Sequence, residues 1–158
     1  MKKYILILLL LLLLMTGCGK DTEEAAPLTP TPTQAVTAEK NIYDDYIADI
    51  EARSDAMKKS LAEDDLTQFD LNIKSKELYD LWDGALNYLW GELKNAMPAD
   101  EFATLTEEQL LWIAEKERSV ADAGKPYEGG SIYALIVNSE AAAITESRVY
   151  ELYGLLKG

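Results

Sequence analysis

The chain has 158 residues, a formal net charge of −13, no histidine and a single cysteine. This length suits one compact domain. A lone cysteine excludes any disulfide within the chain, and the absence of histidine excludes Cys/His zinc sites and histidine-dependent or Ser-His-Asp catalysis. The negative charge argues against nucleic acid as a partner, because binding there depends on Lys and Arg neutralising phosphates. It fits a basic partner or a plain solvated surface.

The first 18 residues have the features of a bacterial export signal. Two lysines precede a wholly apolar run over residues 4–15, which is too short to span a hydrocarbon core that needs about 20 residues. The run ends in Met-Thr-Gly-Cys at 15–18, which resembles the lipobox of bacterial lipoproteins. The resemblance implies a signal peptide over 1–17, acyl chains on Cys18, and anchoring to the outer face of the cytoplasmic membrane. An ordinary signal peptide with an incidental cysteine is the alternative.

Residues 18–40 are predicted to form a tether between the anchor and a folded domain. The segment holds Pro27, Pro30 and Pro32, five threonines and almost no large apolar side chain. Proline-rich sequence favours extended polyproline II backbone, at about 3.1 Å per residue. The tether would therefore hold the domain at residues 41–158 away from the bilayer.

Apolar residues three or four positions apart predict amphipathic helices from residue 41 onward. The first helix is expected over 41–61, with a buried face of Ile42, Tyr46, Ile50, Met57 and Leu61, and with Tyr43 and Ile47 beside it. The second is expected to begin at a capping box over 65–68 and to run to about Met97. Its expected buried residues are Leu71, Leu78, Trp82, Ala85, Leu86, Leu89 and Leu93.

Two further helices are predicted in the second half of the chain. Pro98 is expected in a short helical connection, and a capping box from Thr106 to Gln109 is expected to start a helix that runs to about Ala123. The glycine-rich segment 124–130 is the clearest break, after which Ser131 can cap a fourth helix. The expected buried residues of that helix are Leu135, Ile136, Ala143, Val149, Leu152 and Leu155.

One segment, 131–137, is rich in apolar and β-branched residues and is also compatible with a buried strand. A lone strand would have no partner, and the alanines that follow favour helix. We therefore predict an all-α fold, a small antiparallel bundle of four helices or of three helices and a helical arm.

Four short motifs follow one another in the second half of the chain. They are Trp-Asp-Gly-Ala-Leu-Asn at 82–87, Gln-Leu-Leu-Trp-Ile-Ala-Glu-Lys-Glu at 109–117, Tyr-Glu-Gly-Gly-Ser-Ile at 127–132 and Ile-Thr-Glu-Ser-Arg at 144–148. In this order they resemble the N-terminal domain family of the lysozyme inhibitor LprI, over roughly residues 67–156. The resemblance implies a small helical envelope protein, and the member that gives the family its name implies inhibition of lysozyme.

The chain departs from the family pattern at several positions. Members often carry cysteines near the positions of Lys74, Val120 and Ala141, so the roughly 2–4 kcal/mol that a disulfide contributes must come from packing here. The family's Arg-Asp pair is Lys116-Glu117, which keeps the charge signs but lacks the bidentate fork of arginine. The helix expected over 41–61 lies outside the resemblance.

The glycine-rich loop is the first candidate for a functional site. It comprises Lys125, Tyr127, Glu128, Gly129, Gly130 and Ser131. As a partner-binding loop it would insert Tyr127 into another protein, since tyrosine is favoured at binding hot spots. The simpler interpretation is that the glycines supply backbone angles that other residues resist, ahead of the Ser131 cap.

The second candidate is a polar cluster that would link three helices. It comprises Asp83, Asn87, Gln109, Trp112, Lys116 and Arg148. We interpret it as structural: polar groups that satisfy one another and fix the register of the helices. Gln109 could instead close the capping box with Thr106, and the spacing of Trp112 is typical of a core residue.

Three classes of function remain open. The first is a surface-tethered module that captures or inhibits a basic hydrolase such as lysozyme, which an acidic surface would attract. The second is a structural or interaction lipoprotein of the envelope without a hydrolase target. The third is a glycan hydrolase with paired carboxylates, for which 28 acidic residues give no specific signal. We favour the first class, a protein that is not an enzyme and uses neither cofactor nor metal.

Overall fold

The computed structural model describes residues 41–157, which fold into four α-helices and one short 3-10 turn. The helices are α1 (Ile42–Glu63), α2 (Gln68–Ala96), α3 (Ala99–Gly124) and α4 (Tyr133–Lys157), and the turn η1 (Lys125–Tyr127) follows α3. The prediction of an all-α fold is confirmed, and the alternative strand over 131–137 is wrong because α4 begins within that segment. The predicted signal peptide, Cys18 and the tether lie outside the described residues.

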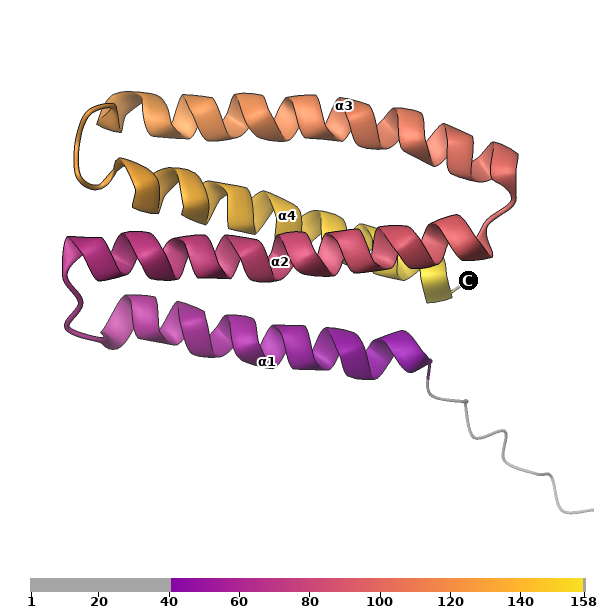
Figure 1. Cartoon of the computed structure of the whole chain (residues 1–158), viewed down its shortest axis with the longest axis horizontal. Coiled ribbons are helices and arrows are strands. Elements are labelled where there is room, and N and C mark those ends of the chain that lie inside the picture. The colour runs from indigo at the N-terminus through magenta and orange to yellow at the C-terminus, as the bar shows by residue number, and fades with distance from the viewer. Residues whose placement is uncertain (1–40, 158) are drawn as a thin grey trace, which may run out of the picture. The chain divides into compact units, whose positions relative to one another are not determined.

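The helices lie side by side along one long axis and alternate in direction (Figure 1). Helices α2 and α4 form the most extensive pair, α1 packs mainly on α2, and α3 packs mainly on α4. Helices α1 and α3 therefore lie on opposite sides of the α2–α4 pair. This arrangement leaves α3 with only a slight direct contact to α2.

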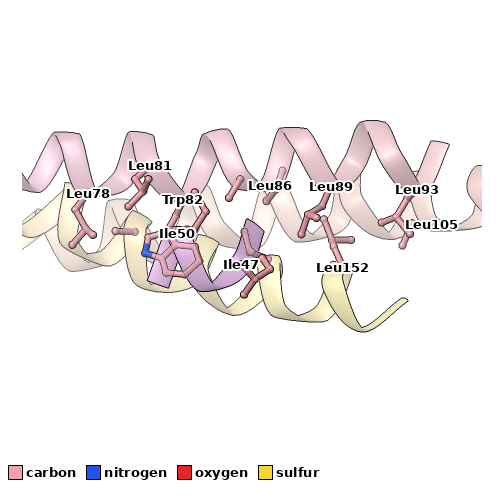
Figure 2. Close-up of a cluster of buried hydrophobic side chains, with 13 residues drawn as sticks. Ile47, Ile50, Leu78, Leu81, Trp82, Leu86, Leu89, Leu93, Leu105 and Leu152 are labelled. Carbon is pink, nitrogen blue, oxygen red and sulfur yellow. The ribbon is translucent and has the colours of Figure 1, made fainter. Parts of the chain in front are cut away.

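The core lies mainly between α1, α2 and α4, and α3 adds one buried apolar side chain, Leu105, at one end (Figure 2). Its most completely buried members include Trp82, Leu89, Leu93, Val149 and Leu152. Burying a side chain of this size contributes roughly 1.5–3 kcal/mol relative to leaving it in water. Because α2 carries more of these residues than any other helix, α2 is the central element of the bundle.

The expected buried faces are accurate for α2 and less so for the outer helices. The expected face of α1 is correct for Ile50, which is buried with Ile47 and Ser54, but Ile42 is 72% exposed. In α4 the expected core residue Leu155 is half exposed, whereas Thr145 is fully buried. Apolar spacing therefore located each helix and most of its inner face, but it included single apolar residues that lie outside the core.

Three predicted helix starts are corrected by the structure. The capping box of α2 is formed by Thr67 and Asp70, not by residues 65–68. Helix α3 begins directly after Pro98, and Thr106 lies inside it, where its hydroxyl donates to the Phe102 carbonyl oxygen at 2.7 Å. Helix α4 begins at Tyr133, two residues after the expected Ser131 cap. The starts of α2 and α4 were misplaced by only a few residues, whereas that of α3 was misplaced by seven.

Candidate functional site

Arg148 joins α4 to α3 at the centre of the polar cluster. Its Nε donates to Gln109 Oε1 at 2.9 Å, and its Nη1 donates to Glu151 Oε2 at 2.6 Å. The Arg148 side chain is only 11% exposed, and its Nη2 is buried without a protein hydrogen-bond partner among the described residues. Gln109 is itself buried and accepts this bond, so the expected capping box of Gln109 with Thr106 is wrong.

The ring of Trp112 lies next to two cations. Lys116 Nζ is 5.1 Å from the ring centroid and Arg148 Cζ is 5.9 Å from it. Lys116 also donates to the hydroxyl of Tyr79 on α2, at 3.3 Å. Cations over an aromatic face are attracted by its quadrupole, by about 0.5–1 kcal/mol at exposed sites and more when desolvated. Trp112 and its two cations therefore connect α2, α3 and α4.

Asp83 and Asn87 form a separate part of the cluster on α2. The side-chain nitrogen of Asn87 donates to the backbone oxygen of Asp83 at 2.9 Å and to its carboxylate at 3.0 Å. Both residues line the same groove as Gln109, Trp112 and Lys116. The structure thus brings the six residues together: five of them line this groove, and Arg148 contacts two of the five, Gln109 and Trp112.

This groove, between α2 and α3, has a volume of about 370 Å³. Its polar lining is Asp83, Asn87, Thr106, Gln109 and Lys116, and its apolar lining is Leu86, Trp90, Leu110, Trp112 and Ile113. Trp90 is held in place by the ring of Phe102, with ring centroids 5.0 Å apart. An apolar hollow with a few polar groups at its edge is typical of sites that accept an apolar side chain or a small molecule.

The loop between α3 and α4 is exposed and is tied to α2. Asn72 donates from its side-chain nitrogen to the Ser131 carbonyl oxygen at 2.9 Å, and Gly130 N–H donates to the Tyr127 carbonyl oxygen at 3.0 Å. Gly129 has a φ angle of +75°, a backbone conformation that residues other than glycine rarely adopt. Lys125, Tyr127 and Glu128 are all exposed on this loop.

Three residues of this region were not predicted from the sequence. Asn72 of α2 donates a hydrogen bond to the loop, and Tyr79 of α2 accepts one from Lys116. Leu110 forms part of the groove wall. Leu110 and Leu111 gave no clear signal in the sequence, since neighbouring apolar residues of a helix can both be buried, as Leu81 and Trp82 of α2 are. Asn72 and Tyr79 gave none either, because long-range polar contacts leave no periodic pattern.

The described residues show neither a metal site nor a membrane span. Within 41–157 no group of three or more His, Cys, Asp or Glu side chains could hold a metal ion. None of the helices α1 to α4 is long and apolar enough to cross a membrane.

The family model described as lysozyme inhibitor LprI matches residues 59–152, which is more than half of the chain. The match begins in the last turn of α1, slightly earlier than the resemblance over 67–156, and it contains the groove, the polar cluster and the loop. Val120 and Ala141 both line another cavity, together with Tyr79 and Lys116. No curated protein and no solved structure matches the chain.

Proposed function

Because the chain belongs to the lysozyme inhibitor LprI family, we propose that it binds and inhibits a basic cell-wall hydrolase of the lysozyme type. The family match over residues 59–152 is the observation that carries this proposal. It concerns a family of inhibitors rather than of enzymes, and so it favours a role in binding over one in catalysis.

The charge of the chain supports a basic partner. Acidic residues number 28 against 15 basic residues, and the formal net charge is −13. Such a surface raises the rate at which a cationic protein arrives and orients it, and added salt weakens the effect within a Debye length of about 8 Å at physiological ionic strength. The same charge disfavours nucleic acid as a partner.

The proposed location is the outer face of the bacterial cytoplasmic membrane, through acyl chains on Cys18. This part of the proposal rests on the apolar run at 4–15 and the lipobox-like sequence at 15–18. If it is correct, Cys18→Ser will abolish incorporation of labelled palmitate and release the chain from the membrane fraction. Unchanged labelling of the Cys18→Ser variant would contradict it.

Inhibition is tested with the full chain reconstituted in zwitterionic lipid vesicles. Hydrolysis of cell-wall substrate by a basic lysozyme should slow in proportion to the amount of chain added, and less so at high salt. Polyglutamate at equal charge is the control for non-specific attraction. A flat dose response at low salt would contradict the proposal and favour the second candidate, an envelope lipoprotein without a hydrolase target.

A further inference from the structure

Helix α3 exposes two adjacent leucines to solvent near the middle of its length. The side chain of Leu110 is 62% exposed and that of Leu111 is 74% exposed, whereas Leu105 on the same helix is buried. Isolated exposed leucines are common on protein surfaces, but neighbouring ones that adjoin a hollow are characteristic of interaction sites. These two leucines therefore form an apolar centre on the solvent face of α3.

Carboxylates surround this apolar centre. Glu107, Glu108 and Glu115 are exposed and lie two to five positions from the leucines, and each is three or four positions, about one helical turn, from Leu111. Glu107 and Glu108 form no ion pair with another residue of 41–157, whereas Glu115 pairs with Arg118. We call Glu107, Glu108, Leu110, Leu111 and Glu115 the α3 patch.

The cations of α3 do little to neutralise this patch. The helix carries seven acidic residues and two basic ones, and the basic ones are Lys116 and Arg118. Lys116 contacts Tyr79 and Trp112, so its charge lies against the bundle, and Arg118 is occupied by Glu115. The solvent face of α3 is therefore predominantly negative.

Leu110 belongs both to the α3 patch and to the lining of the groove between α2 and α3. The patch thus continues into a hollow of about 370 Å³, with Trp90 and Ile113 in its wall. An apolar centre with a charged rim is the usual anatomy of a protein–protein interface, and a hollow that accepts one side chain is the usual place of a hot spot.

We propose that the α3 patch and its groove form the docking surface for a basic protein partner. An apolar or aromatic side chain of the partner enters the groove beside Leu110, and lysines or arginines around it face Glu107 and Glu108. The inference rests on the proposed function and adds the surface that performs it. It places binding on α3 rather than on the loop, where Lys125 and Glu128 cancel and offer a basic partner no net attraction.

The test measures binding of a basic lysozyme to the full chain in zwitterionic vesicles by co-sedimentation. Lysozyme with succinylated lysines is the matched probe, since it keeps the size of the protein and reverses its charge. Glu107→Gln with Glu108→Gln tests the rim, and Leu111→Ser tests the apolar centre. The control for the rim is Asp55→Asn with Asp65→Asn, which changes the charge equally beside α1. The control for Leu111 is Ile42→Ser, because Ile42 is 72% exposed on α1.

We expect each α3 variant to raise the Kd by about tenfold, the effect of a residue near the centre of an interface, while the control variants leave the Kd unchanged. Every variant should keep the helicity of the unchanged chain. The rim variant should also flatten the dependence of Kd on salt, and succinylated lysozyme should not bind. Equal binding by the α3 and control variants, with loss of binding in Tyr127→Ala, would overturn the inference but leave the proposed function standing. Absence of binding by the unchanged chain would overturn both.

Discussion

The indole nitrogen of Trp82 donates a hydrogen bond to the hydroxyl of Ser54 across 3.1 Å, and both side chains are almost completely buried. The bond joins α2 to α1 inside an otherwise apolar region. It satisfies the one polar group of the tryptophan, which would otherwise remain buried without a partner. Trp82 also lies beside the ring of Tyr150 on α4, with ring centroids 5.8 Å apart, so this residue contacts three helices.

Replacing the partner of the indole should therefore destabilise the bundle. We expect Ser54→Ala to lower the free energy of unfolding by about 1–3 kcal/mol, the cost of leaving a buried donor unsatisfied. Urea denaturation followed by circular dichroism measures the change. In a Trp82→Phe background the donor is absent, and the same serine substitution should then have little effect. An equal loss in both backgrounds would show that the bond contributes nothing to stability.

Apolar periodicity predicted Trp82 as a core residue but could not predict Ser54. A serine within an amphipathic helix is normally counted with the solvent-facing residues, and only the presence of a buried donor makes it a core residue. Thr145 on α4 is also fully buried, but its hydroxyl has no hydrogen-bond partner within residues 41–157. The burial of Ser54 depends on a partner in space, and one sequence does not show which residue that is.

The sequence predicted one capping box close to Thr67 and another at Thr106, but only Thr67 caps a helix. The Thr67 hydroxyl accepts from the backbone N–H of Asp70 at 3.2 Å and caps α2, whereas Thr106 lies inside α3. Thr67→Ala should cost about 0.5–2 kcal/mol. Thr106→Ala should cost less or stabilise slightly, because alanine has the higher helix propensity. Thermal unfolding of the two variants provides the comparison, and the opposite ranking would contradict the observed start of α3.

The sequence predicted the members of the polar cluster more accurately than their contacts. Gln109 and Arg148 were expected in one cluster, and they hydrogen-bond, although the helix that carries Gln109 begins seven residues earlier than expected. Helical spacing determines which residues share a face even when the helix end is misplaced. The exposed Leu110 and Leu111 were overlooked because a search for buried faces assigns every leucine to the core.

Tyrosine ionisation should destabilise the bundle at high pH. Burial raises the pKa of the Tyr150 phenol above the ordinary value of 10.0, and the hydrogen bond that it donates to Glu51 at 2.8 Å raises the pKa further. The folded state thus holds the proton more tightly than the unfolded chain, so stability is complete below about pH 10 and falls as the pH rises above it. The hydrogen bond between Tyr43 and Glu92 raises the pKa of Tyr43 in the same direction.

The contribution of Tyr150 to stability can be measured as the slope of Tm against pH. Between about pH 10 and 12 the Tm of the unchanged chain should fall more steeply than that of Tyr150→Phe, which has no proton to lose at this position. Glu51→Gln removes the carboxylate that favours the neutral phenol, and it should also reduce the slope. Parallel curves for all three proteins would contradict a contribution from Tyr150.

The end of α3 approaches α4 so closely that only glycine is accommodated at position 124. A Cβ atom there would lie 2.5 Å from Val137 Cγ1 and 2.9 Å from Tyr133 Cε2, both on α4. Gly124→Ala should therefore lower the free energy of unfolding by about 1–3 kcal/mol through overpacking. The matched control is Gly84→Ala on α2, where a Cβ meets no atom within 4 Å and alanine should stabilise the helix by about 0.5–1 kcal/mol. Urea denaturation of both variants measures the difference, and stabilisation by Gly124→Ala would contradict the close approach of the two helices.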